Sequence, residues 1–385
     1  MRTAMKLAVG LLGGGGAGAT NSVPAAISAT STIGTQNTGT PGTWTGSPVL
    51  TYQWQRNTGS WVDIGGATAL NRTPVDADFG YALRVLEIPN GNVGAAVASN
   101  VTGLTLEAPV QSLGSNLFVD GDAEAVGVAA WINAGGNATL TKTTSTPFEG
   151  AQALSVTSNG GLNPSAMQNI GVNDTYYELD GVGRGNGTAT PRAGGENVWE
   201  WSGSTSTSWQ EFVALFRRTI RIGVGHNTSA AGNNADFDAL RFRAVTLNTQ
   251  LVAPSANMLL TQLYTPPVSP VKGHALWLMA RVSDFATGNY WLALLIYTGS
   301  QWDITAFSVA SHTRTSRITA TNIGDTNGVR INMNADSITL ETRNGSTWTQ
   351  RGSTISNSLY NTATGANVLA ASAFTLSTLG YADPN

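Results

Sequence analysis

The chain has no cysteine among its 385 residues. A disulfide staple, a thiolate nucleophile and a cysteine-based zinc site are therefore excluded, and stability must come from burial or from assembly. Charge is also scarce, because Asp, Glu, Lys and Arg make up 11% of the residues, less than half of the usual share. With a net charge of −3, no clustered positive surface is indicated, so no nucleic-acid partner is expected.

Long apolar runs are missing as well. No stretch approaches the roughly 18 apolar residues of a membrane span, so no membrane association is expected. The apolar run Leu7–Leu12 near the N-terminus is shorter than the ~7 to 15 residues of a signal-peptide core. We therefore expect residues 1–21 to form an uncleaved, glycine-rich arm. Removal of residues 1–19 as a signal peptide is the alternative.

Recognisable catalytic motifs are also missing. The histidines stand far apart, without a second ligand at metal spacing, and each is predicted to lie on the surface or in a loop; they are His226, His274 and His312. A glycosidase needs two carboxylates across a cleft, and the conceivable members are Glu196, Glu200 and Glu211. Because no catalytic motif accompanies them, the chain is not expected to be an enzyme.

Glycine, with 45 residues, is abundant, as are Ser, Thr and Asn. From about residue 41 onward, apolar and polar residues alternate in short runs that Gly, Asn, Asp or Pro interrupt every roughly 8 to 12 residues, and this pattern predicts an all-β fold. Proline-containing breaks near residues 106–116 and 245–257 divide the pattern. We therefore predict three tandem β-sandwich domains behind the arm, at residues 22–108, 113–247 and 250–385.

The first predicted domain contains "GTWTG", "YQWQR" and "DADFGYALRV" in that order. It resembles the immunoglobulin-like domains of bacteria and phages, which carry a Gly-x-Trp-x-Gly segment, a Tyr-x-Trp strand and an Asp-x-Gly corner. In such a sandwich the residue at the position of Trp54 points between the sheets. We therefore predict Trp54 in the core, Tyr52 on the same face of its strand, and Trp61 at the rim.

The second predicted domain runs from "NLFVDGDAEAVGVAAW" to "ADFDALRF" and resembles the jelly rolls of carbohydrate-binding modules. The resemblance implies a structural calcium ion between the opening acidic loop and the closing strand, with Asp122, Glu124 and Asp238 at the matching positions. Three carboxylates and nearby backbone carbonyls would satisfy calcium. Alternatively, these acids are ordinary turn residues and a strand-end charge facing water.

The segment "NVWEWSGSTSTSW" holds the candidate sugar-binding residues of this domain. Aromatic rings stack on the apolar C–H face of a pyranose, while carboxylates and amides bind its hydroxyls. Trp199, Glu200 and Trp201 supply that mixture. By strand alternation Trp199 and Trp201 share one face, either as core residues or as an exposed platform, with Glu200 on the other face. Trp209 is predicted in the core.

The third predicted domain includes "NADSITLETRNGSTW" and resembles the concanavalin or laminin-G type of sandwich. Asn344-Gly345 fits a type I′ hairpin turn. Trp348, beyond that turn, lies either at a binding edge or as a cap on the sheet.

Three small sandwiches behind a glycine-rich head together resemble a structural protein of a tailed bacteriophage particle. A glycine run cannot hold a conformation by itself, so we expect the arm to dock into other virion proteins through Leu7, Leu11, Leu12, Gly13 and Gly14. The resemblance implies a homo-oligomeric fibre or decoration protein that contacts host-surface polysaccharide. The alternatives are a secreted bacterial carbohydrate-binding protein and a purely architectural virion protein.

Overall fold

The computed structural model describes residues 18–90, 94–107, 112–170, 176–195, 198–217, 221–246, 251–284, 289–311, 313–370 and 374–382. Within these ranges the chain is all-β, with antiparallel strands, two single-turn 3₁₀ segments and no α-helix. None of the described segments forms a helix that could cross a membrane. The predicted fold class, an all-β protein built from several packed sheets, is confirmed.

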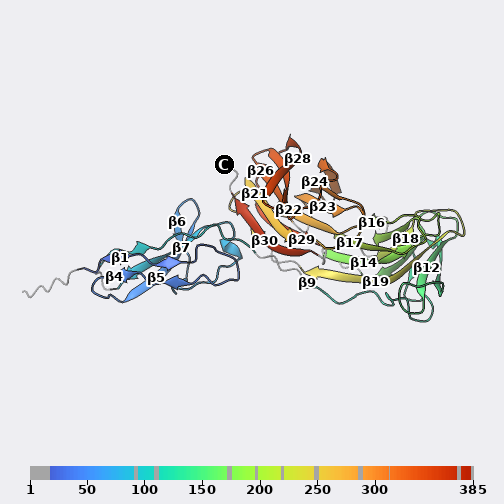
Figure 1. Cartoon of the computed structure of the whole chain (residues 1–385), viewed down its shortest axis with the longest axis horizontal. Helices are drawn as coiled ribbons and strands as arrows, with labels where there is room; N and C mark the ends of the chain where they lie inside the picture. The colour runs from blue at the N-terminus through green and yellow to red at the C-terminus, as the bar shows by residue number, and fades with distance from the viewer. Residues whose placement is uncertain are drawn as a thin grey trace, which may run out of the picture. The chain divides into compact units, whose positions relative to one another are not determined.

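Contacts between residues group the chain into two compact units, residues 1–106 and 107–385. The predicted docking residues of the arm, which lie outside the described residues, are Leu7, Leu11, Leu12, Gly13 and Gly14. The first unit has a four-stranded sheet in the order β6-β5-β7-β8 and two short strand pairs, β1-β4 and β2-β3 (Figure 1). The bounds are β1 Asn21–Val23, β2 Ala26–Ile27, β3 Gly39–Thr40, β4 Thr43–Trp44, β5 Leu50–Asn57, β6 Trp61–Asp63, η1 Asp76–Asp78, β7 Leu83–Pro89 and β8 Val97–Ala98.

Trp54 forms the centre of the core of the first unit. It is completely buried, and its indole Nε1 donates a hydrogen bond to the carbonyl of Ala69 at 2.8 Å. Ile27, Leu83 and Val85 are buried in the same cluster. The prediction that Trp54 lies in the core is confirmed, and the bond to Ala69 satisfies the one polar atom that this burial removes from water.

Two buried carboxylates explain the glycine-bearing segments of the first unit. Glu87 accepts hydrogen bonds from the Gly42 backbone N–H at 2.9 Å and from Trp44 Nε1 at 3.1 Å. A Cβ on Gly42 would lie 2.3 Å from a backbone carbonyl oxygen, so a larger residue does not fit there. Asp78, also fully buried, binds Arg72 Nη2 at 2.6 Å. The Gly-x-Trp-x-Gly and Asp-x-Gly patterns therefore mark buried, hydrogen-bonded anchors.

The second unit contains two sandwiches, each made of two sheets (Figure 1). In the first sandwich, sheet A has the order β10-β13-β18-β15-β16, and sheet B has the order β11-β12-β19-β14-β17 with β9 paired to β19. Sheet A comprises β10 Ile132–Asn133, β13 Ser165–Asn169, β18 Arg221–His226, β15 Pro191–Gly195 and β16 Val198–Ser202. Sheet B comprises β9 Ser112–Leu113, β11 Ala138–Thr143, β12 Ala153–Ser158, β19 Asn234–Thr246, β14 Tyr176–Arg184 and β17 Gln210–Arg217. The 3₁₀ segment η2, Ala134–Gly136, precedes β11.

The second sandwich pairs sheet C, in the order β20-β29-β22-β23-β24-β25, with sheet D, in the order β28-β27-β26-β21-β30. Sheet C comprises β20 Leu251–Val252, β29 Gly365–Ala370, β22 Ala275–Asp284, β23 Asn289–Tyr297, β24 Trp302–Ala310 and β25 Thr313–Ala320. Sheet D comprises β28 Thr347–Ser356, β27 Ser337–Asn344, β26 Gly328–Asn334, β21 Met258–Thr265 and β30 Thr375–Ala382. Both sandwiches fall inside one compact unit, and the predicted limits 113–247 and 250–385 stay predictions.

The turn between β27 and β28 differs from the expected one. Asn344 pairs with Thr347, so the two turn residues are Gly345 and Ser346 rather than Asn344 and Gly345. Gly345 has a φ of +59°, whereas Ser346 is not among the residues with positive φ. A positive φ at the first turn position alone is the pattern of a type II′ turn rather than a type I′ turn.

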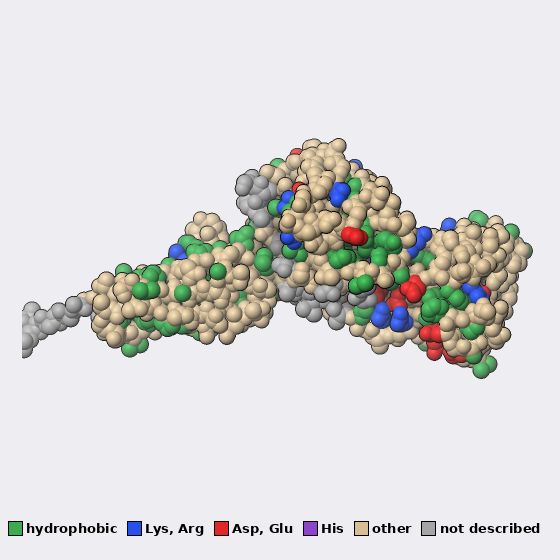
Figure 2. All heavy atoms as spheres, viewed as in Figure 1, with side chains coloured by type: hydrophobic (Ala, Val, Ile, Leu, Met, Phe, Trp, Pro, Cys, Tyr) green, Lys and Arg blue, Asp and Glu red, His purple; other side chains and the backbone are tan. Residues whose placement is uncertain are grey.

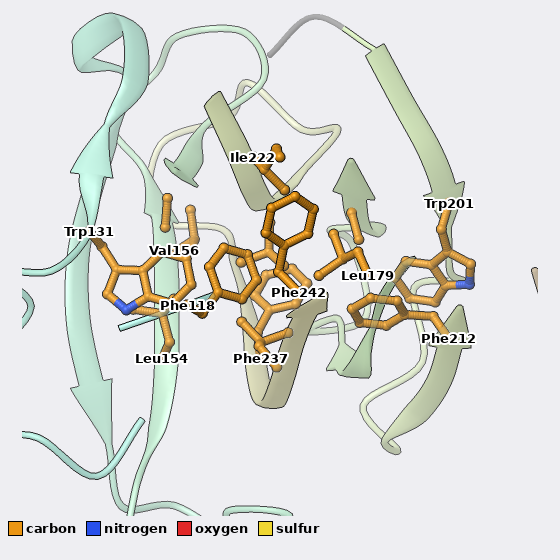
Figure 3. Packing of buried hydrophobic residues seen from close by; sticks show 14 of the residues in the cluster. Phe118, Trp131, Leu154, Val156, Leu179, Trp201, Phe212, Ile222, Phe237 and Phe242 are labelled. Atoms are coloured by element: carbon orange, nitrogen blue, oxygen red, sulfur yellow. The ribbon is translucent and has the colours of Figure 1, made fainter. Parts of the chain in front are cut away.

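The core of the first sandwich is rich in aromatic rings (Figure 3). Tyr177 stacks on Phe242 with ring centroids 4.5 Å apart, and Trp201 stacks on Phe212 at 4.6 Å. Trp201 comes from sheet A and Phe212 from sheet B, so this pair packs the two sheets against each other, whereas Tyr177 and Phe242 lie on neighbouring strands of sheet B.

The two sandwiches of the second unit contact each other directly. Tyr176 of β14 stands edge-on to Trp277 of β22, with ring centroids 6.3 Å apart, and its hydroxyl donates to Met279 Sδ at 3.6 Å. The Val213 N–H of β17 donates to the Lys272 carbonyl at 3.3 Å, so backbone meets backbone at the same junction. Sheet B of the first sandwich is therefore partly covered by the second sandwich.

Candidate functional site

A β-bulge at Glu200 decides which side chains sheet A presents. Ala193 and Gly194 are adjacent in β15, but they pair with Trp201 and Trp199 of β16. Glu200 is the extra residue, and an extra residue reverses the alternation of side chains along a strand. Trp199 and Trp201 therefore point to opposite faces, and the prediction that they share one face is wrong.

Trp201 belongs to the core. It is 3% exposed and stacks on Phe212, as Figure 3 shows at one end of the cluster. A ring with both faces packed in the interior cannot stack on a ligand. Of the two alternatives predicted for Trp201, the structure supports a core residue rather than part of an exposed carbohydrate-binding platform.

Trp199 lies on the outer face of sheet A. A Cβ built on Gly225 would lie 2.9 Å from Trp199 Cη2. Val224 is a core residue, so Gly225 beside it faces outward. Gly194 pairs with both Trp199 and Gly223, which places glycines beneath the ring on β15 and β18. The half-buried indole therefore reaches along the outer face of the sheet from β16 to β18.

Polar side chains flank Trp199 on the same face. Arg192 pairs with Gly225, and its Nη1 lies 3.4 Å from Asn163 Oδ1. Arg221 Nε donates to Asn169 Oδ1 at 3.2 Å. Among the described residues, Trp199 Nε1 and Arg192 Nε are covered and have no hydrogen-bond partner. The face thus combines an aromatic surface, two guanidinium groups and two unpaired donors.

Glu200 is directed away from this surface. Its Oε2 lies 3.8 Å from Arg314 Nη1 of β25, and the Arg314 guanidinium lies over the Trp277 ring at 4.4 Å. Burial raises the pKa of Glu200, while the charge of Arg314 opposes that rise. Glu200 therefore contributes to the contact between the sandwiches, and its predicted role as a sugar ligand beside the tryptophans is not supported by this geometry.

The three acids predicted to bind calcium accept hydrogen bonds from backbone amides. Asp238 is fully buried and its Oδ2 accepts from the Phe148 and Glu149 N–H groups at 2.9 and 3.1 Å. Glu124 Oε1 accepts from two N–H groups of residues 151–152. Asp122 Oδ1 accepts from the Glu124 N–H at 3.3 Å. These bonds hold the turn at residues 148–152, and burial is the largest of the effects that raise the pKa of Asp238.

A lysine supplies positive charge at the opening acidic loop. Lys142 Nζ donates to Asp120 Oδ2 at 2.6 Å and to the Ala123 carbonyl at 2.7 Å. In the part of the chain that the structure describes, no group of three or more His, Asp or Glu side chains is arranged to hold a metal ion. We derive no role for a bound calcium ion. Calcium binding by Asp122, Glu124 and Asp238 stays a prediction from the sequence.

Two of the histidines and Trp209 also differ from expectation. His226 is completely buried and His274 is 7% exposed, although both were expected on the surface or in loops; His312 lies outside the described residues. Trp209 is half buried rather than in the core. Its Nε1 donates to the Thr146 carbonyl at 3.1 Å, and the Arg184 guanidinium lies over its ring at 4.4 Å.

No protein-family model matches the chain, and no curated protein matches it. Among solved structures, the chain is similar to the N-terminal tandem of two CBM22 modules from Paenibacillus barcinonensis Xyn10C, with 8% identity and a TM-score of 0.29, over 70% of this chain and 98% of that one. It is also similar to a carbohydrate-binding module of the β-sandwich superfamily, described for its promiscuous specificity, with 14% identity and a TM-score of 0.23, over 57% of this chain and 97% of that one. At these scores no site is transferred, so function is argued from the residues of this chain.

Proposed function

We propose that the chain binds glycans through the outer face of sheet A, with Trp199 as the stacking surface. The single observation that carries the proposal is the position of this indole, which lies along the sheet above Gly225 and beside Arg192. We infer that the exposed part of this ring stacks on the C–H face of a pyranose.

The polar groups around Trp199 favour glycans with acidic units. Arg192 and Arg221 are donors without acceptor capacity, and guanidinium groups bind carboxylates through paired hydrogen bonds. The described outward positions of β13, β15 and β18 carry no Asp or Glu that would repel such a group.

A glycan array tests this function with the full chain and two variants. Trp199→Ala is expected to weaken binding by at least roughly fivefold, because stacking on one ring contributes about 1 kcal/mol and the ring also shapes the surface. Trp348→Ala is the matched control, since Trp348 is another half-buried tryptophan with a guanidinium, that of Arg330, over its ring at 4.3 Å. Binding that survives Trp199→Ala, or an array without any signal, would contradict the proposal.

Our proposal for the biological setting rests on the sequence resemblance alone. We propose that the chain is a surface protein of a bacteriophage particle, anchored by residues 1–21, that it has a binding rather than a catalytic role, and that it assembles as a homo-oligomer. Deleting residues 1–20 is then expected to prevent incorporation into particles while the two units still fold. A mature N-terminus at Thr20 in mass spectrometry would favour the secreted alternative.

A further inference from the structure

A cavity of about 260 Å³ lies where the second sandwich abuts the outer face of sheet B. Side chains from both sandwiches line it, among them Phe148, Asp180, Glu211, Arg241, Ser269 and His274. Over β14 and β19, Figure 2 shows acidic and basic side chains next to one another, with hydrophobic side chains beside them. We call this space the junction cavity.

The walls of the junction cavity are fixed relative to each other. The Val213 N–H donates to the Lys272 carbonyl across the junction, and Lys272 Nζ donates to the Ser202 carbonyl. Gly273 approaches so closely that a Cβ on it would lie 1.8 Å from the Val213 oxygen. Lys272 and Gly273, which make these contacts, are the chain neighbours of His274 in the cavity lining. The contacts therefore hold His274 in place, and the cavity is formed without a ligand.

One wall of the junction cavity is an exposed aromatic ring. Phe148 is 47% exposed, and its ring stands edge-on to that of Trp209, with centroids 6.2 Å apart. Trp209 is itself held by Arg184 and by the Thr146 carbonyl. Trp209 therefore supports the Phe148 ring from one side, while the exposed part of the Phe148 ring is available to stack on a sugar ring.

Donors and acceptors complete the lining. Arg241 Nε donates to Asp180 Oδ1 at 2.7 Å, and its side chain is 60% exposed, so the outer edge of the guanidinium faces solvent. Arg243 binds the other oxygen of Asp180 and also Glu178. Glu211 is exposed on β17 and offers a carboxylate acceptor. Asp180 therefore holds Arg241 and Arg243 in place. The exposed edge of Arg241 can still donate hydrogen bonds at the cavity, and the carboxylate of Glu211 can accept them.

The charges around the junction cavity nearly cancel. Two lining carboxylates, of Asp180 and Glu211, are matched by two lining guanidinium groups, of Arg241 and Arg243. Burial lowers the pKa of His274, and its Nδ1 accepts from the Val271 N–H at 3.2 Å, so His274 is neutral at pH 7. An acidic ligand would therefore meet no net positive charge in the lining. A neutral ring with several hydroxyls matches the aromatic wall, the donor and the acceptor at once.

We propose that the junction cavity binds a neutral pyranose, in addition to the glycan surface at Trp199. The volume lies just below the roughly 300 to 1,000 Å³ of sites for larger ligands, and it suits a single sugar unit or the end of a chain. This site is on sheet B, whereas Trp199 is on sheet A, so either proposal can fail without the other.

Saturation-transfer difference NMR on the full chain tests the proposal with free glucose, galactose, mannose and N-acetylglucosamine at millimolar concentration. At least one of these sugars is expected to receive saturation. Phe148→Ala should weaken its binding by roughly five- to tenfold through the lost stacking, and Glu211→Gln should weaken it while preserving shape. Trp199→Ala should leave it unchanged.

Three outcomes would overturn the proposal. The first is no saturation transfer to any of the four sugars. The second is transfer that is the same in wild type, Phe148→Ala and Glu211→Gln, which would locate binding elsewhere. The third is tighter binding of glucuronic acid than of glucose in a manner that depends on Phe148, which would contradict the neutral character of the cavity.

Discussion

Replacing Gly273 with alanine is expected to destabilise the second unit by separating its two sandwiches. Gly273 has a φ of +99°, and its Cβ would lie 1.8 Å from the Val213 carbonyl oxygen. Real Cβ atoms essentially never approach closer than 3.0 Å, so the segment must move by at least 3.0 − 1.8 = 1.2 Å. That movement breaks the 3.3 Å hydrogen bond between the Val213 N–H and the Lys272 carbonyl.

Gly299 provides a matched control for this change. Its φ is +101°, nearly the same as that of Gly273, but a Cβ there would only touch Lys272 Cβ at an ordinary 3.4 Å. Backbone strain costs about 1 to 2 kcal/mol at both positions. At Gly273 the lost hydrogen bond adds about 1 kcal/mol and the forced repacking about 1 to 3 kcal/mol. The two variants should therefore differ by roughly 2 to 4 kcal/mol in free energy of unfolding.

Differential scanning calorimetry of the full chain measures this difference. At about 2 to 4 °C per kcal/mol for a unit of this size, the second unit should unfold roughly 4 to 16 °C lower in Gly273→Ala than in Gly299→Ala. The transition should also broaden or split as the sandwiches uncouple. Equal midpoints in the two variants would refute a junction held by close backbone contact.

Three further predictions concern stability. Asp78→Asn leaves Arg72 without its buried partner and should cost the first unit ~2 to 4 kcal/mol in urea unfolding; a loss below ~0.5 kcal/mol would show that the pair is not an anchor. Burial lowers the pKa of His226 from 6.5 to about 4, so the folded state favours the neutral ring. The free energy of unfolding is therefore unaffected by His226 above pH 6.5 and decreases as the pH falls from 6.5 towards 4. His226→Gln should flatten this slope of unfolding free energy against pH, and an unchanged slope would assign it to other groups. Trp201→Ala should cost ~3 to 5 kcal/mol because the ring is in the core, whereas Trp199→Ala should cost much less; equal losses would contradict their placement on opposite faces.

The all-β fold could be predicted because local residue patterns produce it. Alternating runs and frequent turn residues fix strands and their ends, and Trp54 follows from a strand with one buried face. The exchange of faces at Glu200 was missed because a β-bulge depends on the partner strand, here Ala193 and Gly194. Period-two counting along β16 alone has no means of detecting it.

The junction between the sandwiches was missed for a related reason. Its contacts join residues far apart in the chain, such as Val213 with Lys272 and Glu200 with Arg314. Residues at these positions look like ordinary exposed strand and loop residues in the sequence. The burial of His274 also depends on packing against distant residues such as Phe374, which no local pattern of the sequence encodes.

The most direct test of the central claim is a ¹⁵N–¹H NMR titration that follows the indole N–H signals of the eleven tryptophans. The Trp199 signal is assigned by its absence in Trp199→Phe, and the titrant is a glycan that binds the chain on the array. We predict that the Trp199 resonance shifts in proportion to occupancy, while that of the buried Trp201 shifts little. A bound glycan that leaves the Trp199 resonance unmoved would contradict the account.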